Sequence, residues 1–156
     1  MVDATVLIAG TVWPRWSYEV LNHALRGDFN LVLSPLVIEQ ARTNLRSKFP
    51  NYSGRFEFWL VVCPYGLVDD PGHNEVVANA SLVRHIEDVP VALSAMTADV
   101  DCFVSDDKDF TEQSASTQEL HRRLTIMRPV IFLREMMGWS SAELEKVRQR
   151  NWLSES

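Results

Sequence analysis

Four acidic side chains stand near the boundaries between the elements that the sequence predicts. Carboxylates that share one crevice repel one another, so such a set needs a positive charge to hold it together. Oxygen ligands without His or Cys favour a hard divalent ion, Mg²⁺ or Mn²⁺. Such an ion can activate water and polarise a phosphodiester, so the set favours metal-assisted phosphodiester hydrolysis. The four residues are Asp3, Glu39, Asp88 and Asp107.

The elements that must position these acids alternate along the chain. Apolar runs predict strands from residue 1 to about Asp3, within the β-branched segment 1–8, and at 30–33, 101–104 and 124–127. Helical apolar spacing predicts helices at residues 17–26, 36–48, 53–63, 75–85, 89–98, 130–137 and 140–150. Alternation of this kind predicts an α/β fold with a mostly parallel sheet, formed by residues 1–156 as a single domain.

A parallel sheet would bring the four acids to one place. The carboxyl ends of its strands and the amino ends of the following helices share one edge. Asp3 and Asp107 follow predicted strands, whereas Glu39 and Asp88 lie at the starts of predicted helices. We therefore expect all four at one edge of the sheet.

Composition and charge limit the kinds of surface that this protein can present to nucleic acid. The 156 residues carry 15 basic and 21 acidic side chains, a formal net charge of -6, which argues against a surface that binds nucleic acid over its whole area. Residues 69–112 alone hold 2 basic and 11 acidic side chains. A bound cation would offset part of this excess.

Cysteine usage and hydropathy add two exclusions. Cys63 and Cys102 lack the spacing of a zinc or redox motif, which excludes a disulfide scaffold. No apolar run reaches the roughly 18 residues that span a bilayer, and no signal peptide is evident. We expect a cytoplasmic protein with no membrane partner.

The same acids carry a resemblance to the PIN-domain ribonucleases. The likeness spans residues 1–137 in order and spacing, and its motifs lie in segments 2–8, 34–39, 88–92 and 104–110. The resemblance implies a three-layer α/β/α fold with a central, mostly parallel twisted sheet. It also implies an endoribonuclease that depends on Mg²⁺ or Mn²⁺, often the toxin of a toxin–antitoxin pair, with RNA as substrate and an antitoxin protein as partner.

The resemblance assigns roles to individual residues. It places Asp3, Glu39, Asp88 and Asp107 as the catalytic, metal-binding acids. Asp109 stands where a further acid is frequent, Thr5 where the family has a small polar residue, and Ser105 where it usually has Thr. Asp106 replaces the usual Gly and is a candidate participant. Only two residues precede Asp3, so the first strand is unusually short for the family.

Two residues near Glu39 leave two interpretations open. Glu39 can be a solvent-facing helix residue that pairs with Arg42 at i+3 and lies near Arg46 at i+7. Equally, Arg42 and Arg46 can contact RNA phosphates beside the metal acid. Asp88 likewise has the sequence context of a plain helix N-cap.

A second functional hypothesis comes from the departures from the family pattern. The short first strand, Thr5 and Asp106 fit a non-catalytic PIN-like module that binds RNA or a protein partner. Family likeness, together with Trp and Phe residues beyond the needs of a core, suggests a homodimer.

Overall fold

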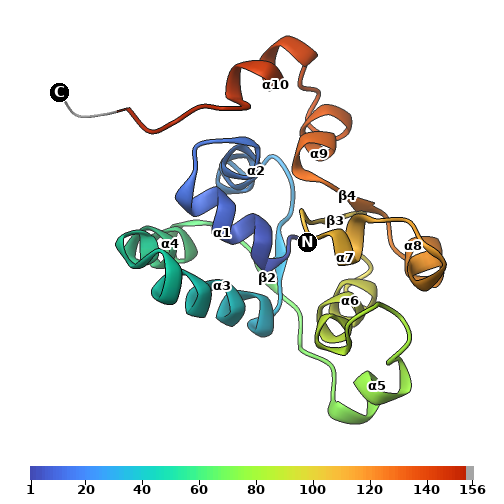
Figure 1. The fold of residues 1–156 in the computed structure, drawn as a ribbon. Coiled ribbons are helices and arrows are strands. Elements are labelled where there is room, and N and C mark those ends of the chain that lie inside the picture. Colours follow the sequence, from blue (N-terminus) through green and yellow to red (C-terminus); the bar gives the residue numbers. More distant parts are fainter. Residues whose placement is uncertain (154–156) are drawn as a thin grey trace.

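The computed structural model describes residues 1–153, and most of them are helical (Figure 1). These residues form ten α-helices, three short 3-10 helices and four strands of two residues each. In chain order the elements are α1 (Ala4–Val12), α2 (Trp16–Leu25), β1 (Val32–Leu33), α3 (Pro35–Lys48), η1 (Pro50–Tyr52), α4 (Ser53–Val62), β2 (Gly66–Leu67), α5 (His73–Ala78), η2 (Ile86–Asp88), α6 (Val89–Thr97), β3 (Phe103–Val104), α7 (Lys108–Thr111), η3 (Ala115–Thr117), α8 (Gln118–Arg123), β4 (Ile126–Met127), α9 (Pro129–Glu135) and α10 (Ser141–Val147).

The predicted three-layer α/β/α fold with a central twisted sheet is wrong. Within residues 1–153 the strands form two separate parallel pairs, β1 with β2 and β3 with β4. A single parallel bridge from Val2 to Val104 is all that forms of the predicted first strand. The parallel direction agrees with the sequence, but the fold is mostly helical.

Helix starts limit two of the parallel segments, the Val2 bridge and β1. Asp3 is the N-cap of α1, so the chain leaves the Val2 bridge directly into a helix. Ser34 caps α3 in the same way, and Pro35 begins that helix without an N–H that a strand ladder could use. Segment 1–8 is β-branched, yet most of it packs as α1, with Val6 and Leu7 fully buried.

Most predicted helices are present with shifted ends, and one is much shorter. The helices predicted at 17–26, 36–48, 53–63 and 89–98 correspond to α2, α3, α4 and α6. The helix predicted at 75–85 is represented by α5, which ends at Ala78, where turns replace it before η2.

The elements pack around one hydrophobic cluster that includes side chains from Met1 to Leu144. Val2, Leu33 and Phe103, which belong to the strand segments, are all fully buried in it. Gly10 lets α1 and α2 approach closely, because a Cβ at this position would lie 2.5 Å from the Leu21 Cδ1 atom and 2.9 Å from the Ser17 carbonyl oxygen. This contact sets the position of α1 and so of Asp3 at its start.

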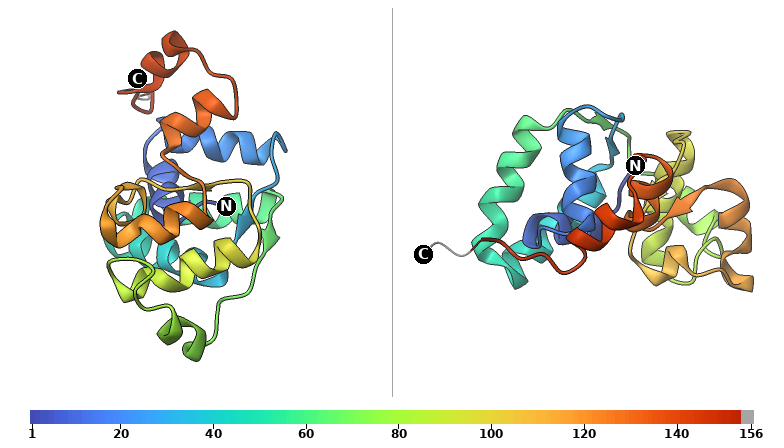
Figure 2. Two further views of the ribbon diagram at one scale, coloured as in Figure 1. Left: turned by 90° about the vertical axis from the view of Figure 1, so that its right-hand side faces the viewer. Right: turned by 90° about the horizontal axis from the view of Figure 1, so that it is seen from above.

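Figure 1 shows α1 to α4 gathered on one side of the molecule and α5 to α8 on the other, with the N-terminus between them. The chain after α10 runs back over the first helices (Figure 2). Arg150 Nε donates a hydrogen bond to the Pro14 carbonyl oxygen at 2.6 Å, and Trp152 Nε1 donates one to that of Val12 at 2.7 Å. Among residues 1–153, none of the helices combines the length and the hydropathy that a membrane span requires.

Candidate metal centre

Three carboxylates from two separate parts of the chain meet beside the carboxyl end of β3. Asp88 is the last residue of η2, directly before α6, whereas Asp107 and Asp109 belong to the start of α7. One carboxylate oxygen of each lies within 4.8 Å of the corresponding oxygens of the other two. All three side chains are partly buried. We call Asp88, Asp107 and Asp109 the acidic triad.

Local hydrogen bonding fixes the two triad residues of α7. Asp107 is the N-cap of that helix, and its Oδ1 atom accepts a hydrogen bond from the Asp109 backbone N–H at 2.9 Å. This cap holds the Asp107 carboxylate next to Asp109, two residues further along the chain. Asp88 reaches the same place through the fold, since η2 and α6 pack against this region from another part of the chain.

The electrostatics of the triad favour a cation. Partial burial raises the pKa of Asp88 to about 6, and the neighbouring charges of Asp107 and Asp109 add to the increase. Desolvation and charge repulsion therefore both disfavour the ionised form of Asp88. A divalent ion bound to the three oxygens would remove both penalties, and this donor set fits Mg²⁺ or Mn²⁺.

Asp3 lies beside the triad as a buried hydrogen-bond acceptor. Its side chain is 4% exposed. Its Oδ2 atom accepts a hydrogen bond from Ser105 Oγ at 2.5 Å, and its Oδ1 atom accepts one from Thr5 Oγ1 at 2.6 Å and one from the Val6 N–H at 3.3 Å. Both carboxylate oxygens of Asp3 are therefore engaged with the protein.

The same hydroxyls connect Asp3 to the triad. Ser105 Oγ accepts a hydrogen bond from the Asp107 backbone N–H at 3.0 Å, and Thr5 Oγ1 accepts one from the Asp106 N–H at 3.1 Å. The loop after β3 is thus tied to the start of α1. Thr5 and Ser105, predicted as supporting residues, join the acids in one network, whereas the Asp106 side chain is exposed.

We predict that Asp3 makes the stability of the metal-free protein depend on pH. Burial, the largest cause, together with the nearby Asp107 charge, raises the pKa of Asp3 from 3.8 to about 6. The unfolded chain loses this proton near pH 3.8 and the native protein only near pH 6. The stabilisation is therefore complete below pH 3.8 and is lost as the pH rises through 6. The loss should reach about 3 kcal/mol.

Asp3→Asn provides the comparison, because asparagine is neutral at every pH and remains a good N-cap. Urea unfolding in EDTA from pH 4 to 8 should show the wild type losing stability relative to this variant. A constant difference between the two proteins across this range would contradict the assignment.

Glu39 and its neighbouring arginines form a separate cluster between α3 and α4. The Glu39 Oε2 atom accepts a hydrogen bond from Arg42 Nη1 at 3.0 Å. Arg42 also donates to both oxygens of Glu57, at 2.6 and 3.1 Å. Glu57 and Glu39 hold the pKa of Arg42 above its usual value. Arg46 is exposed on the same helix, and its charge contributes to the lowered pKa of Glu57.

The structure thus brings together only part of the predicted site. Asp88, Asp107 and Asp109 converge, and Asp3 is linked to them through Ser105. Glu39 does not belong to this group, and Arg42 is occupied by two carboxylates.

Sequence reasoning missed three residues around the triad. His85 Nε2 lies 3.5 Å from Asp109 Oδ2, and Arg84 and Lys108 line a cavity together with Asp109. One signal was present in the sequence, because Arg84 and Lys108 are the two basic residues of the acidic segment 69–112.

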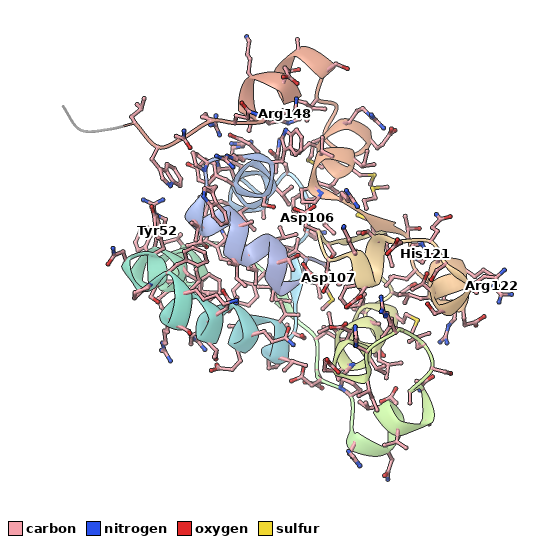
Figure 3. All side chains as sticks on the ribbon, in the orientation of Figure 1. Tyr52, Asp106, Asp107, His121, Arg122 and Arg148 are labelled. Carbon is pink, nitrogen blue, oxygen red and sulfur yellow. The ribbon has the colours of Figure 1, made fainter. Side chains whose placement is uncertain are left out.

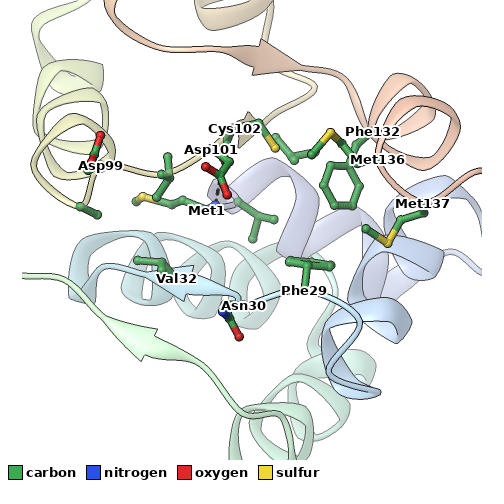
Figure 4. Close-up of a pocket in the computed structure, with 14 residues that line it drawn as sticks. Met1, Phe29, Asn30, Val32, Asp99, Asp101, Cys102, Phe132, Met136 and Met137 are labelled. Atoms are coloured by element: carbon green, nitrogen blue, oxygen red, sulfur yellow. Dashed lines mark hydrogen bonds between the residues drawn. The ribbon is translucent and has the colours of Figure 1, made fainter.

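A cavity of about 410 Å³ lies at the opposite end of β3 (Figure 4). Phe29, Phe132 and Met136 contribute apolar walls, and Asp99 and Asp101 supply carboxylates. None of the predicted site residues lines it. This cavity is therefore separate from the acidic triad.

Comparisons with known proteins bear on the fold. No protein-family model and no curated protein matches the chain. Among solved structures, the chain is similar to PAE2754 from Pyrobaculum aerophilum, with 17% sequence identity and a TM-score of 0.57 over 88% of this chain and 94% of that chain. At this level of identity the likeness shows a shared fold alone.

Proposed function

We propose that the protein is an endoribonuclease that depends on Mg²⁺ or Mn²⁺ and hydrolyses RNA phosphodiester bonds. The observation that supports this proposal most is the convergence of Asp88, Asp107 and Asp109, whose carboxylate oxygens lie within 4.8 Å of one another. Two distant parts of the chain are folded together to produce this unfavourable concentration of charge. Holding a divalent ion accounts for it.

In this proposal some residues bind the metal ion and others position those ligands. The triad would hold the ion, which would activate water and stabilise the leaving oxygen of a phosphodiester. Asp3 acts as a positioning residue, because it holds Ser105, which in turn accepts the hydrogen bond of the Asp107 N–H. His85 Nε2 lies 3.5 Å from Asp109 Oδ2, at the edge of the triad.

The identity of the substrate and the biological role rest on the resemblance to PIN-domain ribonucleases. RNA as substrate, a role as the toxin of a toxin–antitoxin pair, an antitoxin partner and a homodimer are proposals on that ground. The role of Glu39 as a further metal ligand also rests on the resemblance, and it would require Glu39 to break its hydrogen bond with Arg42.

A cleavage assay tests the proposal. Purified protein should cut labelled single-stranded and hairpin RNAs in Mg²⁺ or Mn²⁺, and EDTA should stop the reaction. Absence of cleavage across a broad set of RNAs in both metals, with protein shown to be folded, would contradict it.

One observation favours a non-catalytic module that binds RNA or a protein partner. Both oxygens of Asp3 are engaged by hydroxyls and an N–H, and Glu39 is paired with Arg42, so two of the four predicted acids are occupied within the protein. A protein of this kind would bind RNA without cutting it in either metal. The cleavage assay therefore separates the two functions.

A further inference from the structure

A cavity adjoins the acidic triad and shares Asp109 with it. Its volume is about 460 Å³, within the range of roughly 300 to 1,000 Å³ that is usual for ligand pockets. Arg84, from the chain before η2, and Lys108, from the start of α7, line it together with the hydroxyl-bearing Ser114 and Ser116. Glu112 supplies the second carboxylate of its wall.

The two cations of this cavity are available to a ligand. Both side chains are exposed. Within residues 1–153 neither forms a salt bridge or a side-chain hydrogen bond, unlike Arg42, which is held by two glutamates. They are also the two basic residues among the 13 charged ones of segment 69–112. Both positive charges of segment 69–112 therefore line the cavity that contains Asp109 of the triad.

The surface next to this cavity is also hollowed. A second cavity, of about 570 Å³, shares Ser114 and Thr117 with the first and extends to His121 and Arg122 on α8. Figure 3 shows Asp107 near the centre of the molecule and His121 and Arg122 further out. The two cavities therefore lie side by side.

We propose that Arg84 and Lys108 bind a phosphate of the RNA strand adjacent to the bond that is cut. This assignment rests on the proposed ribonuclease function and names the residues that hold its substrate. It moves the phosphate contacts from Arg42 and Arg46 on α3 to the cavity beside Asp109. Contacts of this kind add affinity without reading sequence, and salt weakens them.

The test measures RNA binding by fluorescence anisotropy with a labelled 12-nucleotide single strand. Asp107→Asn serves as the parent protein, so that the RNA is not cut during the titration. Adding Arg84→Gln and Lys108→Gln should weaken binding at every KCl concentration. The slope of log K against log[KCl] should become shallower by roughly 0.7, the value for one phosphate of a single strand that is no longer neutralised.

The double variant Lys146→Gln and Arg148→Gln is the matched control, since it removes the same two charges from an exposed lysine and an exposed arginine at the end of α10. It should leave the affinity and the slope unchanged. Thermal unfolding of each variant checks that the fold is intact.

An unchanged slope in the Arg84→Gln and Lys108→Gln variant would overturn the assignment. If Arg46→Gln weakens RNA binding and this double variant does not, the phosphate contact belongs to α3 instead. If the unsubstituted protein neither binds nor cuts RNA, the proposed function itself fails, and the phosphate site fails with it.

Discussion

Replacing Asp107 by asparagine should lower the rate of RNA cleavage by about 100-fold or more. The substitution removes one of three charges that hold the ion, and metal catalysis contributes several kcal/mol of transition-state stabilisation, with about 1.4 kcal/mol for each factor of ten. The fold should survive, because Asn Oδ1 can still accept the hydrogen bond of the Asp109 N–H that caps α7. Initial rates in saturating Mn²⁺ and a thermal unfolding curve provide the two measurements.

Asp101→Asn is the matched control for this experiment. Asp101 is an exposed aspartate that lies before β3, at the opposite end of that strand from Asp107, and it lines the other cavity. The same change of charge there should leave the cleavage rate as it is. If Asp107→Asn cleaves RNA as fast as the wild type, Asp107 does not take part in the reaction. If the variant fails to fold, Asp107 has a structural role.

Mn²⁺ should stabilise the protein, and the Asp88→Asn variant should lose this response. An ion that binds only the native state stabilises it by about 2.7 kcal/mol at 100 times the dissociation constant. In a chain of this size that corresponds to a rise in Tm of several degrees. Burial, followed by repulsion from Asp107 and Asp109, raises the pKa of Asp88 to about 6. Protons therefore compete with the ion for this carboxylate, and the stabilisation should weaken as the pH falls below 6.

Differential scanning fluorimetry over a Mn²⁺ series at pH 7.5 and pH 5 measures both effects. Asp101→Asn again supplies the control and should respond to Mn²⁺ as the wild type does. The same Tm rise in Asp88→Asn and the wild type would show that the ion binds elsewhere.

The positions of most elements could be predicted from the sequence, but their assembly could not. Ser34-Pro35 marks the start of α3, and Ser140 with Glu143 forms the capping box that begins α10, because caps are local signals. A continuous sheet was predicted because apolar runs at 1–3, 30–33, 101–104 and 124–127 have the composition of buried parallel strands. In each of the three later runs only the last two residues pair, as β1, β3 and β4, and the two residues before them are not part of a strand.

In the candidate site, too, the local features could be predicted from the sequence and the tertiary contacts could not. Asp3 and Asp107 could be selected because each follows a predicted strand, and Asp88 because it precedes a predicted helix. Asp109 was selected through the resemblance, in which a further acid is frequent at its position. The partners of Glu39 could be foreseen only in part. Arg42 lies one helical turn away and was identified, whereas Glu57 reaches the same arginine through the packing of α4 on α3. Contacts of this second kind depend on tertiary structure and leave no local pattern.

We propose that Asp88, Asp107 and Asp109 bind one divalent ion. The decisive experiment is a crystal structure of the protein with Mn²⁺, with anomalous scattering recorded for the metal. We predict an anomalous peak in contact with a carboxylate oxygen of each of the three residues, next to the loop that Ser105 ties to Asp3. Anomalous density only at other positions, or none at a Mn²⁺ concentration that saturates any thermal response, would contradict the account.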